Sequence, residues 1–157
     1  MHDSVSYLRN NLSHETDILH EYFIPRDRFV QFVDGLREIV KSAPVPLLSA
    51  SVRVVHREDN LLTYAPADDM LAVMLYVNQL TDRTGREQMD AFTRQVVDLC
   101  LRANGRFFLP YQVAYTREQL ERSYPQIRDF LAARTEFDPG RVLTSTFVEK
   151  IEALLGQ

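Results

Sequence analysis

Stretches with the two-residue period of a β-strand alternate along this chain with stretches that have the period of a helix. Residues 17–25 alternate apolar side chains with their neighbours and end at a proline, which indicates a strand. Apolar residues then recur at helical spacing from Phe29 to Val40, which predicts a helix over residues 27–42. A fold for this chain therefore has to place strands and helices in alternation.

The rest of the chain continues this order. Residues 48–56 alternate again and predict a half-buried strand, whereas residues 70–78 are almost continuously apolar, which is typical of a central strand. A helical period follows over residues 84–103, and residues 106–109 give a short fourth strand. The order β-α-β-β-α-β with a helical tail predicts an α+β fold of the ferredoxin-like (split βαβ) kind, an antiparallel sheet with helices on one face. The other face is then either solvated or covered by another structure.

Helix boundaries are marked by three candidate capping boxes, in which a hydroxyl side chain and a Glu or Gln side chain bond to free amides at a helix start. The pairs are Thr84 with Glu87, Thr116 with Gln119, and Thr146 with Glu149. The dipeptide at residues 104–105 (Asn-Gly) predicts a left-handed C-cap for the helix that precedes it. Three short helices are therefore expected after the fourth strand, with the last one near the C-terminus.

Composition and charge exclude several classes of protein. A length of 157 residues fits one domain, and the net charge of -4 without a basic stripe argues against a general nucleic-acid binder. The third strand offers only Tyr76 where an RNA-recognition sheet needs several stacked aromatics and basic residues. No apolar run is long enough for a membrane span, no signal-peptide core opens the chain, and the single Cys100 excludes an intramolecular disulfide. We expect a cytoplasmic protein with no nucleic-acid partner.

The polar first residues differ from the periodic remainder. Residues 1–16 lack any hydrophobic period, and we interpret them as a lead-in or linker remnant before a folded domain at residues 17–157. His14-Glu15 with His20 has an outward similarity to a zinc helix signature, but its histidines are six residues apart instead of four, so no metal site is predicted. Cys100 lies on the apolar face of its predicted helix, which predicts a buried, inert thiol. No glycine-rich nucleotide motif or nucleophile elbow is present.

Polar residues on otherwise apolar strands are the strongest candidates for a site. They are, in pairs, Ser51 and Arg53, Tyr76 and Asn78, and Tyr111 and Gln112. Residues two apart on a strand point to the same side of the sheet. We therefore predict that the first two pairs converge on one sheet face and that the third lies just after the fourth strand. The pattern leaves open the alternative that this is an ordinary solvent-facing side of the sheet.

Several segments of the chain, in order, resemble one enzyme family. They are residues 20–25 (HEYFIP), 51–53 (SVR), 105–111 (GRFFLPY), 124–130 (YPQIRDF), 137–139 (FDP) and 142–143 (VL). Over residues 17–152 the chain resembles the C-terminal substrate-binding (cap) half of FAD-linked oxidoreductases of the vanillyl-alcohol oxidase type. It looks most like aldonolactone oxidase, alditol oxidase and decaprenylphosphoryl-ribose oxidase-like members. The resemblance implies an enzyme that moves a hydride from the CH–OH group of a sugar-like alcohol or lactone to FAD.

The resemblance also implies catalytic residues. Arg53 resembles the family's sheet arginine near the substrate. Tyr111, or its neighbour Gln112, falls where many members carry a substrate lysine. We take Arg53 and Tyr111 as the candidate catalytic residues, and the departure from lysine bears on whether this chain is catalytically competent.

Binding residues follow from the same resemblance. Ser51 stands where several sugar-alcohol oxidases have a glutamate, a departure that bears on the substrate class. We take it, with Tyr76, Asn78 and Gln112, as a candidate substrate-binding residue. Ser145 resembles the position at which the tail returns toward the flavin, and it is the candidate cofactor-binding residue.

The family's N-terminal FAD-binding half does not occur in this sequence, whether the chain is a truncated piece, a split-enzyme subunit or an orphaned domain. A flavin needs a protein that binds and orients it, so we expect weak FAD binding and no catalysis by this chain alone. The expected partners are an FAD-binding domain or subunit in trans, or a second copy through the exposed sheet face, with a small-molecule alcohol as substrate. The alternative is a ferredoxin-like small-ligand-binding or dimerisation module without redox activity.

Overall fold

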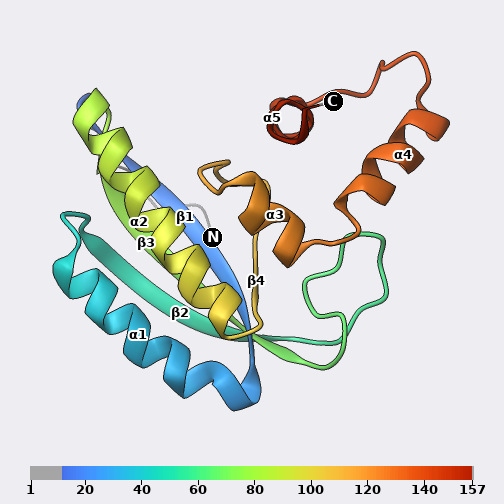
Figure 1. The fold of residues 1–157 in the computed structure, drawn as a ribbon. Helices are drawn as coiled ribbons and strands as arrows, with labels where there is room; N and C mark the ends of the chain where they lie inside the picture. The colour runs from blue at the N-terminus through green and yellow to red at the C-terminus, as the bar shows by residue number, and fades with distance from the viewer. Residues whose placement is uncertain (1–11, 157) are drawn as a thin grey trace, which may run out of the picture.

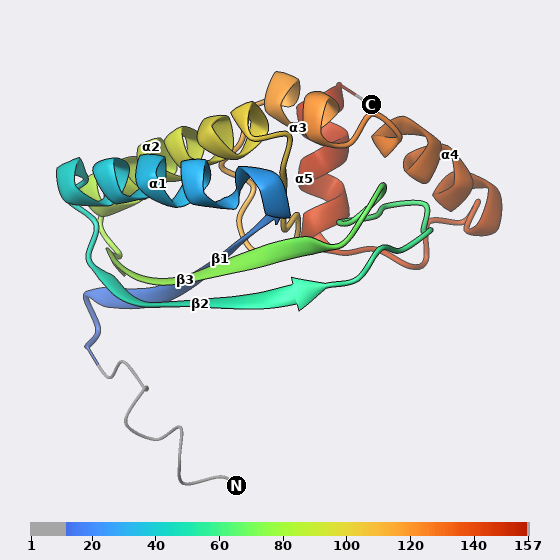
Figure 2. The ribbon, with the colours of Figure 1, turned by 90° about the horizontal axis from the view of Figure 1, so that it is seen from below.

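The computed structural model describes residues 12–156, where one four-stranded antiparallel sheet has five α-helices on one side of it (Figures 1 and 2). The elements are β1 (Glu15–Pro25), the 3-10 helix η2 (Arg26–Arg28), α1 (Phe29–Ser42), β2 (Leu47–Val55), β3 (Met70–Leu80), α2 (Arg83–Arg102), β4 (Arg106–Phe107), α3 (Arg117–Ser123), α4 (Ile127–Phe137) and α5 (Thr146–Leu155). Residues 1–11 of the predicted lead-in lie outside the described part of the chain. The rest of that stretch already contains the start of β1.

The strand order across the sheet is β2-β3-β1-β4, with every pair of neighbours antiparallel. β1 and β3 pair along their whole length, from Glu15 opposite Leu80 to Pro25 opposite Met70. The structure confirms the predicted α+β class, the antiparallel sheet and the central place of the third strand. The finer assignment to the ferredoxin-like kind stays a prediction.

Both outer strands differ from what the sequence predicts. β2 is exposed along nearly its whole length, so the prediction of a half-buried strand was wrong. It lies at the edge of the sheet, and α1 and α2 pack over β1 and β3 instead. β4 is also shorter than the predicted residues 106–109. The amide of Phe108 still donates to Glu21 O at 2.9 Å, but Pro110 has no amide hydrogen with which to extend the pairing.

Only one of the three predicted capping boxes is present. Thr116 and Gln119 exchange both bonds of the box at the start of α3, which confirms that prediction. At α2 the cap is Asp82, which accepts a hydrogen bond from the Gly85 amide at 2.7 Å, and not Thr84. At α5 the cap is Ser145, one residue before the predicted Thr146. Capping depends on which residue leaves the helical conformation, so spacing alone does not determine it.

The two residues of the Asn-Gly dipeptide after α2 have different roles. Asn104 adopts the left-handed conformation, with φ of 56°, and so ends the helix. Gly105 is needed for space, because a Cβ atom there would lie 2.6 Å from Phe23 O and 2.8 Å from Cys100 Sγ. This close approach lets β4 pair with β1 immediately after the helix.

The main hydrophobic core lies between the sheet and the helices. Its fully buried members include Ile24, Phe32, Leu75, Met89, Val96, Leu120 and Ile127. A second, smaller core lies on the opposite side of the sheet, where Phe23, Met70 and Ala72 pack with Ala65. The segment between β2 and β3 therefore covers one end of the sheet face that the helices leave uncovered. In the described part of the chain, no helix is both long enough and apolar enough to cross a bilayer.

Candidate functional site

The predicted polar residues lie on the sheet face that is turned away from the helices. We call this the open face; it consists of residues 17, 19, 21 and 23 of β1, residues 49, 51, 53 and 55 of β2, and residues 70, 72, 74, 76 and 78 of β3. In the strand pairing Ser51 is opposite Met74 and Arg53 is opposite Ala72, on the same side as Tyr76 and Asn78. The pairing thus confirms that these two pairs of residues share one face.

Arg53 is held by a carboxylate from the far side of β3. Its Nε and Nη2 both donate to Glu21 Oε1, at 3.0 Å and 2.6 Å. The Glu21 side chain is only 2% exposed whereas the Arg53 side chain is 60% exposed. Glu21 therefore fixes the inner edge of the guanidinium group, and the outer part of the group faces the space above the sheet.

A second carboxylate organises the other polar pair. Asp17 on β1 accepts a hydrogen bond from the Tyr76 hydroxyl at 3.0 Å and from the Asn78 amide at 2.8 Å. The hydrogen bond to the Asp17 carboxylate raises the pKa of Tyr76, because it stabilises the protonated phenol. The open face thus carries two networks, each centred on an acidic residue of β1.

A row of aromatic rings lies at the end of the open face that the smaller core covers. Tyr64 stacks on Phe23 and on Phe108, with ring centroids 4.5 Å and 5.4 Å apart. The ring centroids of Phe108 and Tyr111 are 4.4 Å apart. Burial raises the pKa of Tyr64 to about 12. Tyr111, at the exposed end of the row, is the predicted catalytic residue after β4. The exposed ring of Tyr111 offers a surface against which another ring can pack.

A small cleft lies between β1, α2 and the segment after β4. Its volume is about 20 Å³, and Glu21, Tyr111, Gln112 and His20 are among the residues that line it. Glu21 thus belongs both to this cleft and to the open face, and it connects Arg53 with the predicted residues after β4. The cleft has room for about one water molecule and none for a sugar-like substrate.

His20 is the polar group at the inner wall of this cleft. Its ring is buried and stacks on Phe92, and its Nδ1 lies 3.2 Å from the Tyr22 hydroxyl. Burial lowers the pKa of His20 to about 4, so the ring is neutral at pH 7. Its Nε2 is buried and has no hydrogen-bond partner within residues 12–156.

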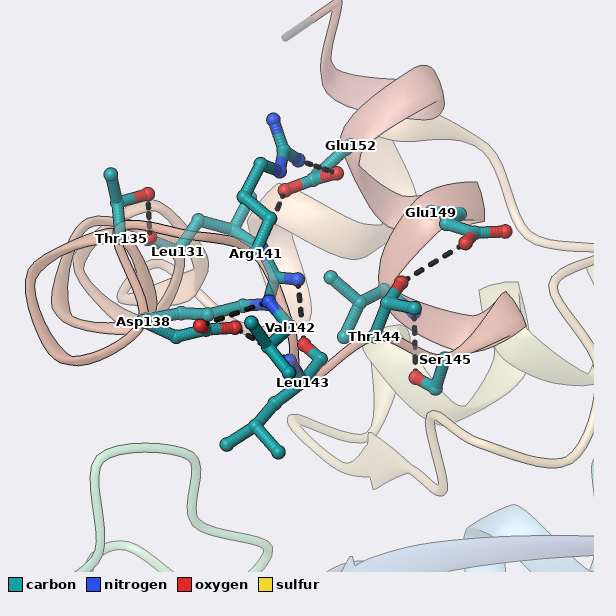
Figure 3. A network of polar contacts seen from close by, with 12 residues as sticks. Leu131, Thr135, Asp138, Arg141, Val142, Leu143, Thr144, Ser145, Glu149 and Glu152 are labelled. Atoms are coloured by element: carbon teal, nitrogen blue, oxygen red, sulfur yellow. Dashed lines mark hydrogen bonds and ion pairs between the residues drawn. The ribbon is translucent and has the colours of Figure 1, made fainter.

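Ser145 lies at the start of α5, where the structure gives it a local task (Figure 3). Its hydroxyl oxygen accepts a hydrogen bond from the Val148 amide at 3.3 Å and caps the helix. The loop that leads to it is fixed by Asp138, whose carboxylate accepts from the amides of Val142 and Leu143. The proposed contact of Ser145 with a cofactor stays a prediction.

Sequence reasoning missed the two residues that hold the site together, Asp17 and Glu21. Both are polar members of the alternating pattern in the first strand, so the signal was present. Their partners could not be read from the sequence because they lie on other strands. Cys100, by contrast, is buried as predicted; burial raises the pKa of its thiol, and Sγ donates to Arg106 O at 3.2 Å.

The groups on the open face suit an oxygen-rich or planar ligand. Arg53 and Asn78 have N–H groups beyond those that bond Glu21 and Asp17, and the aromatic row ends in the exposed ring of Tyr111. Neutral and cationic donors beside aromatic rings suit such a ligand better than they suit a metal ion. No group of three or more His, Cys, Asp or Glu side chains suited to a metal occurs in the described residues.

A comparison with models of known protein families matches residues 8–151 of the chain to the family described as D-arabinono-1,4-lactone oxidase. The match takes in the whole sheet and continues into α5. A search of curated proteins finds no match.

Proposed function

Because the chain belongs to the D-arabinono-1,4-lactone oxidase family, the C-terminal aldonolactone oxidase-type domain of FAD-linked oxidases, we propose that it supplies the substrate-binding face of an FAD-dependent oxidoreductase. The reaction is oxidation of the CH–OH group of a sugar-like alcohol or lactone. A bound FAD would supply the acceptor for the hydride that leaves the carbinol carbon. The chain acts in the cytoplasm and is not catalytic by itself.

The observation that carries this proposal is a set of polar side chains held in place on an exposed sheet face. Small-molecule sites usually enclose some 300–1,000 Å³, whereas the cleft beside Tyr111 encloses about 20 Å³. The open face nevertheless holds Arg53, Tyr76 and Asn78 in place by fixed hydrogen bonds. A face with preset donors and no roof becomes a binding site when a second layer covers it.

The chain's residues then have distinct tasks. Arg53 donates a hydrogen bond to the carbinol oxygen and stabilises the negative charge that develops there while the hydroxyl proton passes to water. Tyr111 and Gln112 contact the same substrate from the segment after β4. Glu21 is a positioning residue, since it acts by fixing Arg53.

Further polar groups orient the substrate. Tyr76 and Asn78, held by Asp17, and the exposed Ser51 bind its remaining hydroxyl groups. Ser145 approaches the cofactor from the end of the α4–α5 loop. Its hydroxyl hydrogen is still available to donate, because the cap at α5 uses only the oxygen as an acceptor.

The second layer is an FAD-binding domain or subunit. A surface near the end of α4 supports such a partner: Phe137, Val142 and Leu143 are 86%, 80% and 75% exposed. Phe137 ends α4, and the loop that follows it is held in place by Asp138, which accepts from the amides of Val142 and Leu143 (Figure 3). Arg134 also donates to Leu143 O at 2.8 Å. A rigid apolar group at the surface loses little entropy on binding, which favours a protein contact.

A titration with FAD tests this proposal. Flavin fluorescence is followed with the purified chain alone, and then with a candidate flavin-binding chain added. We expect binding of FAD to the pair and turnover of a sugar-like alcohol only when both chains are present. Tight binding of FAD by this chain alone contradicts the need for a second layer, and no binding under either condition contradicts the flavin role.

Site assignment is tested in the reconstituted pair with Arg53→Ala. Loss of the transition-state hydrogen bond should lower kcat/KM by about a hundredfold. Arg83→Ala is the matched control, because Arg83 also pairs with a glutamate but lies on the exposed start of α2. Turnover that stays within about twofold for Arg53→Ala removes this residue from the site.

A further inference from the structure

A pocket of about 230 Å³ lies where α2 ends and β3 and β4 begin, beside the end of α3. It is lined by two arginines, Arg106 and Arg122, and by Ser123. None of these residues belongs to the open-face networks. The pocket is far larger than the water-sized cleft beside His20, so it has room for a small ligand.

The two guanidinium groups lack the carboxylate partner that many other arginines of this protein have. Arg106 donates to Thr63 O and lies 5.2 Å from the ring centroid of Tyr124, and Arg122 donates to Leu101 O at 3.3 Å. Among residues 12–156, neither forms an ion pair with a carboxylate within 4.0 Å. By contrast, neighbouring Arg117 and Arg128 both pair with Glu121. Glu58 acts on Arg106 electrostatically without forming an ion pair with it, and the pocket still brings two guanidinium groups together in a chain whose net charge is -4.

Two further features point to a bound anion. Arg106 is partly buried, and this burial lowers the pKa of its guanidinium group because the charge is poorly solvated. The Ser123 hydroxyl oxygen is fully buried and has no hydrogen-bond partner in the described part of the chain. A buried hydroxyl without a partner is costly, and rotation of the Ser123 side chain toward the pocket that this residue lines would let a ligand oxygen relieve that cost.

We propose that this pocket binds a phosphate-class oxyanion, held by Arg106, Arg122 and the Ser123 hydroxyl. Guanidinium groups bind phosphate oxygens with short, charge-assisted hydrogen bonds, and the hydroxyl adds a neutral donor. The ligand is either inorganic phosphate or the phosphoryl group of a small phosphorylated sugar. This site is separate from the proposed redox function and does not depend on the flavin-binding partner.

Calorimetric titration of the 157-residue chain tests the site, with inorganic phosphate and ribose 5-phosphate as probes at constant ionic strength. Both ligands carry the anion, and tighter binding of the sugar phosphate identifies a phosphorylated metabolite as the source. Arg122→Gln should weaken binding at least about tenfold, because a charged hydrogen bond is lost. Ser123→Ala should weaken it by a smaller factor. Arg106 is left unchanged, since it also supports Thr63 and Tyr124.

Arg37→Gln is the matched control. It removes the same charge from the exposed surface of α1, where Arg37 Nη1 lies 3.5 Å from Asp34 Oδ1. This substitution should leave the affinity for phosphate unchanged. Thermal unfolding in chloride verifies that each variant is folded. The proposal is wrong if the unaltered chain binds neither probe, or if Arg37→Gln weakens binding as much as Arg122→Gln.

Discussion

The two faces of β1 differ in how they accommodate polar side chains: one buries a neutral ring, and the other holds carboxylates by hydrogen bonds. On the helix-covered face, Tyr22 and Ile24 are packed into the main core, and the polar His20 is kept neutral by burial. On the open face, Asp17 and Glu21 keep their charge-bearing groups bonded to side chains from other strands. One strand thus provides stability on one side and a preset polar surface on the other.

This difference shows how a small domain can display function without weakening its core. Apolar burial on the covered face supplies most of the stability of the sheet, so the open face can carry polar groups that add less to folding. Edge strand β2 is the extreme case, because it is exposed and still holds Arg53 in a fixed place. Three experiments test this division.

The largest effect is expected from the covered face. Phe32 is fully buried and contacts Tyr22, with ring centroids 6.1 Å apart. Phe32→Ala should lower the free energy of unfolding by about 3–5 kcal/mol, because it leaves a cavity in the main core. Leu19→Ala on the open face is the control and should cost less than about 1 kcal/mol. Equal losses in urea denaturation would contradict the division between the faces.

A pH series separates His20 from the acidic residues on the other side of its strand. The pKa of His20 is lowered to about 4, against an ordinary value near 6.5, so the unfolded chain binds more protons between these two values. The free energy of unfolding should therefore fall as pH drops from 6.5 to 4, by up to about 3 kcal/mol in total.

His20→Phe isolates this contribution. The variant should lose the part of the pH dependence that lies between pH 6.5 and 4, as measured by urea denaturation at each pH. His14→Gln, at an exposed histidine, should keep the dependence of the unaltered chain. An unchanged pH profile for His20→Phe would rule out the buried imidazole as its source.

The smallest effect concerns the Glu21–Arg53 pair. Arg53→Ala should lower the free energy of unfolding by about 1–3 kcal/mol, because it leaves the carboxylate of Glu21 buried without its cation. The double variant Arg53→Ala/Glu21→Gln should regain part of this loss, and a double-mutant cycle measures the coupling.

An exposed ion pair gives the reference for this cycle. Arg83 Nε lies 2.7 Å from Glu87 Oε1, but both side chains are exposed on α2. Their coupling energy should not exceed about 0.5 kcal/mol. If the two cycles give the same coupling, burial of Glu21 adds nothing to the pair on the open face.

Local patterns explain how much of this molecule could be predicted. The alternation in residues 17–25 and the apolar run in residues 70–78 correctly indicated two paired strands. The two-residue spacing also placed Ser51 with Arg53 on one face. These predictions hold because the direction of a side chain on a strand depends only on its position along that strand.

The residues that complete the site depend on long-range pairing. Glu21 reaches Arg53 across β3, and Asp17 reaches Tyr76 and Asn78 from β1, which only the register of the sheet determines. Helix caps such as Asp82 and Ser145 were missed for a related reason. Several nearby residues have cap chemistry, and the surrounding structure selects one of them.

The sequence by itself determined the order of strands and helices, the buried side of the first and third strands and the family, because these follow from local period and residue order. Only the tertiary structure decided which strand lies at the edge, which carboxylate holds Arg53 and how small the cleft beside His20 is. Those properties arise from contacts between residues far apart in the chain. Their geometry is set when the whole sheet assembles and the helices close over one of its faces.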